Sequence, residues 1–90
     1  MKLNFEQLEI FIDIAHKQCQ VSDMREAFAN VLYQSGQGIA AHSIAMKIYQ
    51  SKGETEYDER EVELIKKYSE LTTPAFIDAV NRAMEESNNQ

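Results

Sequence analysis

The sequence has few residues that interrupt regular structure. Its 90 residues include three Gly and one Pro, and Trp is absent. A flexible linker and a β-sandwich with many turns both need more Gly and Pro than this, so both are excluded. Hydrophobic residues make up 43% of the chain, which is enough for a core and argues against wholesale disorder. A chain of this length forms one domain.

The sequence is also poor in cysteine, in basic residues and in long apolar runs. Cys19 is the single cysteine, so no internal disulfide forms, and we expect the protein to be located in the reducing cytoplasm. Nine Lys and Arg stand against fifteen Asp and Glu, a net charge of −6. Nucleic acid is therefore an unfavourable partner, because binding to phosphates depends on Lys and Arg. No apolar run approaches the roughly 20 residues that cross a bilayer, so we expect no membrane partner.

Hydrophobic periodicity predicts helices along most of the chain. Asn4 is a suitable N-cap for the first helix, and apolar residues then recur at helical spacing: Leu8, Phe11, Ile12, Ala15 and Cys19. A second helix begins near Ser22 or Asp23 and ends at Gly36. A third helix occupies 38–52, and its inward face is predicted to consist of five residues: Ala41, Ile44, Ala45, Ile48 and Tyr49.

Two further helices have clear start signals. Asp58 and Glu61 form a capping box for a helix over 58–71, and Thr73-Pro74 opens the last helix. Residues 54–57 are interpreted as a loop, because a single strand there would have no evident partner. We therefore predict an all-α fold, a compact bundle of about five short helices. It forms a single domain over residues 1–86, followed by a frayed polar tail over residues 87–90.

The densest charge cluster lies at the start of the fourth predicted helix. Six carboxylates fall within residues 54–63, with Arg60 the one basic residue among them. Stabilisation of a helix N-terminus accounts for such a cluster without any function. The functional alternative is a docking face for a host or cognate protein with a basic surface. Its candidate residues are four carboxylates and one aromatic anchor: Glu54, Glu56, Glu59, Glu63 and Tyr57. Tyr57 has an alternative role, because it can instead form the hydrophobic staple at the start of the helix.

The sequence contains no complete set of catalytic or metal-binding residues. His16 and Cys19 share a face of the first predicted helix, but a zinc site needs three or four ligands. Cys19 also lies on the apolar stripe, where a thiol is not activated. Gly53 precedes the acidic residues, an order that does not match a calcium-binding loop. We therefore assign no catalytic, cofactor-binding or metal-binding residue, and we expect a protein that is not an enzyme and needs no cofactor.

A DNA-binding regulator of the helix-turn-helix type is the alternative from another class. A Gly-containing turn joins the second and third predicted helices, as that motif requires. The helix over 38–52 would then read the DNA with four outward residues: His42, Ser43, Lys47 and Gln50. These residues include no Arg to bind guanine. The neighbouring segment 54–71 carries a charge of 3 − 7 = −4, so protein binding is the preferred hypothesis.

Two apolar residues, Ile10 and Ile14, lie beside the main stripe of the first predicted helix. They make this helix apolar over more than half of its circumference. Either both side chains are buried inside the bundle or they form the contact of a symmetric homodimer. The sequence leaves both alternatives open.

The middle of the chain resembles known small proteins. The run GQGIAAHSIAMKIY over 36–49, with Gly53 and the segment DEREV over 58–62, is similar to small α-helical accessory proteins that bacteriophages and other bacterial mobile elements encode. This resemblance carries no active-site residue. It implies a protein that binds and modulates a host protein. The sequence therefore predicts a small acidic, non-catalytic protein–protein interaction module.

Overall fold

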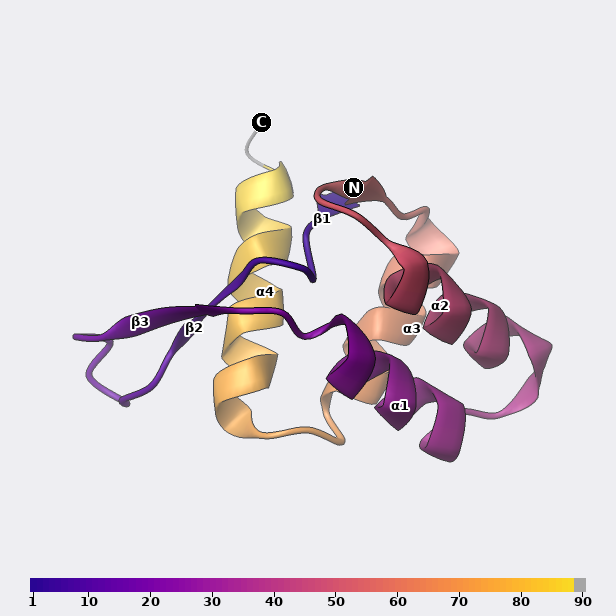
Figure 1. Cartoon of the computed structure of the whole chain (residues 1–90), viewed down its shortest axis with the longest axis horizontal. Helices are drawn as coiled ribbons and strands as arrows, with labels where there is room; N and C mark the ends of the chain where they lie inside the picture. Colours follow the sequence, from indigo (N-terminus) through magenta and orange to yellow (C-terminus); the bar gives the residue numbers. More distant parts are fainter. Residues whose placement is uncertain (89–90) are drawn as a thin grey trace.

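The computed structural model describes residues 1–88 and combines helices with short strands. In chain order the elements are β1 (Lys2–Leu3), β2 (Leu8–Phe11), β3 (Cys19–Ser22), α1 (Arg25–Ser35), α2 (Gly38–Gln50), β4 (Thr55–Glu56), α3 (Glu59–Ser69) and α4 (Pro74–Asn88). The prediction of an all-α bundle of about five helices is wrong, because the described residues form four helices and two antiparallel two-stranded sheets. Figure 1 shows the β2–β3 hairpin projecting to one side of the helices.

The predicted first helix is a β-hairpin. Strands β2 and β3 pair antiparallel, with Leu8 opposite Ser22 and Phe11 opposite Cys19. The physical reason is a second periodicity in the same residues. Apolar side chains also recur at every second position, and most of them are β-branched and favour strands: Leu8, Ile10, Ile12 and Ile14.

The polar residues that were expected to start or continue this helix form turns instead. The Asn4 side-chain oxygen accepts hydrogen bonds from the amides of Glu6 and Gln7, both at 3.1 Å, so it caps a single turn. In the hairpin loop, the Asp13 carboxylate accepts from the amide of Gln18 at 3.0 Å. This bond is the main reason that the pKa of Asp13 lies below its ordinary value.

Side chains from the hairpin and from α4 fix the hairpin in place. The rings of Phe11 and His16 stack with centroids 4.3 Å apart, and the Arg82 guanidinium lies 4.3 Å from the centroid of Phe11. His16 Nε2 lies 3.2 Å from the carboxylate of Asp78. Arg82 also donates a hydrogen bond to the backbone carbonyl of Glu9. Helix α4 therefore covers the outer edge of β2.

The segment predicted as a loop before the fourth helix contains strand β4. This strand pairs with β1, with Lys2 opposite Glu56 and Leu3 opposite Thr55. The N-terminal ammonium of Met1 lies 2.8 Å from the carboxylate of Glu56 and adds to this pairing. The two paired strands are more than 50 residues apart in the sequence, so no local pattern indicates that residues 55–56 have a partner.

Helices α3 and α4 begin where their start signals predict. The Asp58 carboxylate accepts from the amide of Glu61, and the Glu61 carboxylate accepts from the amide of Asp58, which forms the predicted capping box. The Thr73 hydroxyl oxygen accepts from the amide of Phe76 at 3.3 Å. Helix α4 continues to Asn88, so two residues of the predicted tail are helical, and residues 89–90 lie outside the described residues.

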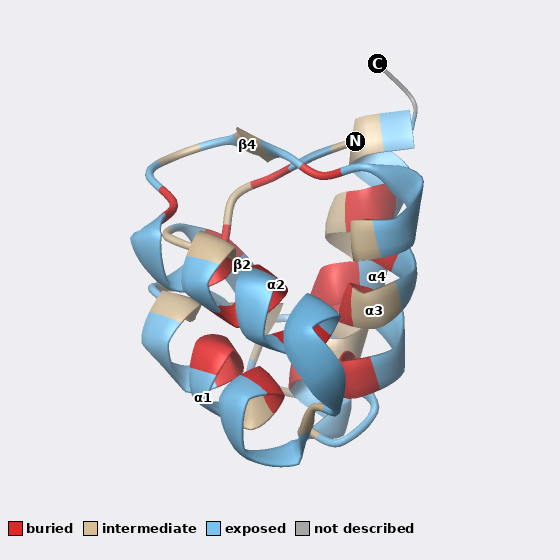
Figure 2. Cartoon of the chain, turned by 90° about the vertical axis from the view of Figure 1, so that its right-hand side faces the viewer, coloured by how far each residue is buried: buried red, intermediate tan, exposed pale blue. Residues whose placement is uncertain are grey.

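The core is built around four aromatic side chains from separate segments. The ring centroid of Phe5 lies 5.5 Å from that of Phe28 and 6.0 Å from that of Tyr57. The rings of Phe28 and Phe76 lie 5.0 Å apart. These contacts join the N-terminal segment, α1, the start of α3 and α4. Figure 2 shows the buried positions on the inner sides of these helices and exposed positions on their outer sides.

The close approach of α1 and α2 at Gly36 is testable. A Cβ atom at this position would lie 2.6 Å from the Cβ of Ala41 and would clash with the carbonyl oxygen of Leu32. We expect Gly36→Ala to lower the free energy of unfolding by roughly 1–3 kcal/mol, as overpacking does. Urea unfolding followed by circular dichroism measures the change. Gln37→Ala, at the exposed next residue, should change stability by less than about 0.5 kcal/mol, and equal effects of the two variants would contradict this packing.

Candidate functional site

Helix α2 is apolar on two opposite sides. Its inner side is buried in the core through Ala41, Ile44, Ala45 and Ile48. A second stripe at spacings of three and four faces outward: Ile39, His42, Met46 and Tyr49. Three of these side chains are large and apolar or aromatic and remain exposed, with 84% of Ile39, 41% of Met46 and 54% of Tyr49 accessible. The prediction that Tyr49 belongs to the inward face is therefore wrong.

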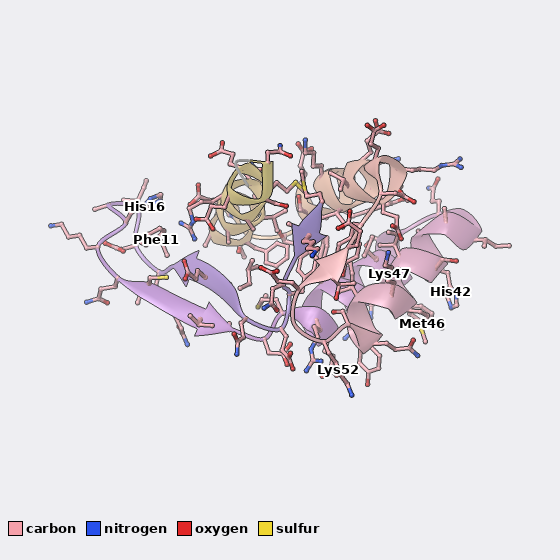
Figure 3. All side chains as sticks on the ribbon, turned by 90° about the horizontal axis from the view of Figure 1, so that it is seen from above. Phe11, His16, His42, Met46, Lys47 and Lys52 are labelled. Atoms are coloured by element: carbon pink, nitrogen blue, oxygen red, sulfur yellow. The ribbon has the colours of Figure 1, made fainter. Side chains whose placement is uncertain are left out.

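Helix α1 extends this exposed surface. The Tyr33 side chain is 65% exposed, and its ring centroid lies 5.8 Å from that of His42 on α2. We call this surface the outer face and define it by five residues: Tyr33, Ile39, His42, Met46 and Tyr49. Figure 3 shows His42 and Met46 projecting from the side of α2 that is turned away from the other elements. None of the five residues carries a fixed charge.

A helix-turn-helix regulator needs exposed polar and basic side chains on its reading helix, and the four residues predicted for this role do not all meet that need. His42, Ser43 and Gln50 are exposed on α2. Lys47, however, is half-buried, with its Nζ atom 2.9 Å and 3.0 Å from the two carboxylate oxygens of Glu61. The same Nζ atom lies 4.7 Å from the centroid of the Tyr57 ring. One of the two cations in the predicted reading helix over 38–52 is therefore paired with α3, and Lys52, just beyond the end of α2, is the exposed cation that remains for phosphate.

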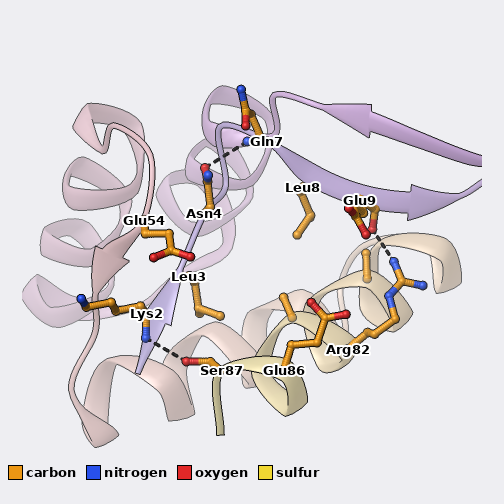
Figure 4. Close-up of a pocket in the computed structure, with 12 residues that line it drawn as sticks. Lys2, Leu3, Asn4, Gln7, Leu8, Glu9, Glu54, Arg82, Glu86 and Ser87 are labelled. Carbon is orange, nitrogen blue, oxygen red and sulfur yellow. Dashed lines mark hydrogen bonds between the residues drawn. The ribbon is translucent and has the colours of Figure 1, made fainter. Parts of the chain in front are cut away.

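Three of the predicted acidic docking residues line two different hollows. Glu54 lies beside a hollow between β1, β2 and α4 (Figure 4), whereas Glu59 and Glu63 lie beside a separate hollow near Met1. Glu56 binds the N-terminal ammonium, and this hydrogen bond lowers the pKa of its carboxyl group. All four carboxylates, Glu54, Glu56, Glu59 and Glu63, are exposed, and Glu56 is the one that is paired.

Hydrogen bonds of the chain itself lie around the hollow in Figure 4. The Ser87 hydroxyl oxygen accepts from the amide of Lys2 at 3.0 Å, and Arg82 donates to the carbonyl of Glu9. Charges of both signs line it, including Lys2, Arg82 and Glu86. Two hydrogen bonds thus hold β1 and β2 against α4 at this hollow, and the charged side chains of Lys2 and Glu86 remain in its lining.

The residues predicted for self-association also have different positions. Ile10 lies in β2, where it is half-buried and packs against the core, and Ile14 lies fully exposed in the hairpin loop. They do not share a helix face, because this segment is not helical. A dimer built on a helix with both side chains at its interface is therefore incompatible with the fold.

Sequence reasoning missed the outer face as a surface. The signal was present, because residues 39, 42, 46 and 49 follow the same helical spacing as the buried stripe of α2. A helix that is apolar all round is normally taken as buried. Which of the two stripes faces the core depends on where α1 and α3 pack, and this is a property of the tertiary structure.

Comparisons with known proteins assign no family. No family model matches the sequence, and no similar protein was found among curated proteins or solved structures. Among the described residues, no group of three or more His, Cys, Asp or Glu side chains is placed to hold a metal ion. Within residues 1–88, no helix has the length and apolar character that crossing a membrane requires.

The predicted aromatic anchor Tyr57 belongs to the core. Its side chain is fully buried, so it is not accessible to a partner. Within the described residues its hydroxyl group has no hydrogen-bond partner. Burial raises the pKa of Tyr57 to about 12.

Tyr57 gives this fold a defined sensitivity to alkaline pH. In the unfolded chain Tyr ionises near its ordinary pKa of about 10, whereas in the folded protein the pKa of Tyr57 is about 12. The folded state holds this proton more tightly than the unfolded state does. The contribution of protonated Tyr57 to the free energy of unfolding is therefore complete below about pH 10 and is lost as the pH rises towards 12. Urea unfolding across this range should show a fall in stability that Tyr57→Phe reduces.

The same variant tests the buried hydroxyl group. Because the buried hydroxyl group has no hydrogen bond of good geometry among the described residues and the Ser51 side chain is its one polar neighbour there, Tyr57→Phe should cost little stability at neutral pH. Tyr33→Phe is the matched control, since Tyr33 is exposed and should change neither the stability nor its pH dependence. An undiminished alkaline loss of stability in Tyr57→Phe would contradict this assignment.

Proposed function

We propose that this protein is a small, acidic, non-catalytic interaction module that binds a partner protein through the outer face of α1 and α2. The observation that supports this proposal is the exposure of three large side chains together: Ile39 at 84%, Tyr33 at 65% and Tyr49 at 54%. Clustered exposed apolar side chains are characteristic of interaction sites, and Tyr and Met are enriched in protein interfaces.

The spacing of the exposed stripe favours one mode of recognition. Ile39, Met46 and Tyr49 lie along one side of α2, at the positions by which an amphipathic helix inserts into a groove of its partner. The partner surface would be an apolar groove. The net charge of −6, to which the exposed Glu59 and Glu63 contribute, favours a partner with a positive surface potential, because opposite charges accelerate association.

The resemblance to proteins of bacteriophages and other mobile elements adds the biological setting to this proposal. The partner would be a host protein in the cytoplasm, and binding would modulate its activity without catalysis by this chain. Protein binding is preferred over DNA binding because Lys47 is paired with Glu61. An uncharged, aromatic and Met-containing surface suits the groove of a protein better than it suits phosphates.

The proposal is tested by affinity capture from nuclease-treated bacterial lysate with the tagged protein. We expect one protein to be retained near stoichiometrically. Met46→Lys places a charge in the centre of the outer face and should reduce its retention at least tenfold, since residues at the centre of an interface contribute about 2 kcal/mol or more. Quantitative mass spectrometry of the retained fraction provides the measurement.

The matched control is Leu71→Lys, which makes the same kind of change at a 59% exposed apolar residue between α3 and α4. It should retain the partner like the natural protein. An equal loss in both variants would point to a general effect of the added positive charge and would contradict the outer face as the binding surface. If no protein is retained, and if the purified protein binds added DNA in a nuclease-free assay with an affinity that falls steeply with salt, the DNA-binding alternative is favoured instead.

A further inference from the structure

Strand β3 has one edge that no helix or strand in residues 1–88 covers. It packs against β2 and against no other helix or strand of the described residues. Its residues Cys19, Gln20 and Val21 are exposed, and the strand contains neither a charged residue nor Pro. Natural proteins normally protect such an edge with charges, Pro or a covering element. In this hairpin α4 covers the edge of β2, whereas the edge of β3 is open.

The hydrogen-bond pattern identifies the backbone groups on the open edge. The amide of Ile12 donates to the carbonyl of Gln18 at 3.0 Å, so these two residues form a hydrogen-bonded pair. In an antiparallel ladder such pairs alternate with pairs that are not hydrogen-bonded. Gln20 is therefore bonded to β2, whereas the N–H and C=O groups of Cys19 and Val21 point away from β2. These four groups are available to another strand.

We propose that two copies of this chain pair antiparallel through their β3 strands and form a continuous four-stranded sheet. A two-fold axis at Gln20 places Cys19 of each copy opposite Val21 of the other, so all four free backbone groups of each strand find partners. The same register places Lys17 opposite Asp23 of the second copy at both ends of the pairing. A C₂ interface must be complementary to itself, and this segment satisfies that requirement.

Charge complementarity selects a second copy over an unrelated extended peptide. The sequence KQCQVSD over 17–23 begins with a cation and ends with an anion, and its central residues are uncharged. Antiparallel pairing with itself therefore brings opposite charges together at both ends, which stabilises directly opposed pairs. Lys17 has no ion pair within the described residues, whereas the Asp23 carboxylate is bound by Arg25 at 2.7 Å, so at each end of the pairing Lys17 would join an existing ion pair.

This pairing is separate from the binding proposed for the outer face. Figure 1 shows the β2–β3 hairpin and α2 on opposite sides of the molecule. A dimer formed through β3 leaves both outer faces open. The two proposals can therefore succeed or fail independently.

Disulfide trapping tests the register. Residues in a pair that is not hydrogen-bonded have Cα atoms about 4.5 Å apart, within the range of disulfides. Gln20 faces Gln20 of the second copy in this way, so Gln20→Cys in a Cys19→Ser background should form a cross-linked dimer under mild oxidation. Val21→Cys in the same background is the control. Its two copies would be diagonal neighbours about 7–8 Å apart, too far for efficient bonding.

Sedimentation equilibrium tests the dimer itself. The natural chain should approach twice its 10.3 kDa mass with rising concentration. Val21→Pro removes an outward N–H group without breaking a bond to β2, so it should remain monomeric with an unchanged circular dichroism spectrum. Lys17→Glu should weaken the dimer and leave the fold intact. A natural chain that stays monomeric, a dimer that survives Val21→Pro, or equal trapping at positions 20 and 21 would each overturn the proposal.

Discussion

The burial of the Phe5 ring is the interaction on which the rest of the structure depends. Phe5 contacts Phe28 of α1 and Tyr57 at the start of α3, and its carbonyl accepts from the amide of Met24 at 2.8 Å. These contacts hold the N-terminal segment inside the molecule. They place β1 beside β4 and direct β2 along α4 (Figures 1 and 2). In a domain of this size the burial of a few aromatic rings is a large part of the hydrophobic stabilisation.

The same arrangement decides which surfaces remain free. With α3 and α4 packed on the aromatic core, α2 turns Ile44 and Ile48 inward and leaves Met46 and Tyr49 exposed. Arg82 of α4 binds the edge of β2 and leaves β3 uncovered. The two free surfaces lie on opposite sides of the molecule (Figure 1). A dimer through β3 would present two outer faces, and a partner with two sites would bind it with increased avidity.

Local signals predicted the helices but not the strands. The start of α3 was predictable because Asp58 and Glu61 satisfy each other's backbone amides, and no distant residue is needed for that. The hairpin was not predictable, because residues 8–14 match the spacing of a helix and that of a strand equally well. In the folded protein the extended segment is held along α4 by contacts of Phe11 with His16 and Arg82, which come from outside residues 8–14.

For the candidate site, too, local sequence signals were sufficient for some features and tertiary contacts were needed for others. The sequence by itself determined the acidic charge, the single cysteine and the helical segments that begin at residues 38, 59 and 74, because these depend on composition and on neighbours a few residues away. Only the tertiary structure decided that Tyr57 is buried, that Lys47 is paired with Glu61 and that the second stripe of α2 is exposed. Each of these depends on segments that lie far apart in the chain, and the energy of such contacts is set by packing, which local periodicity does not encode.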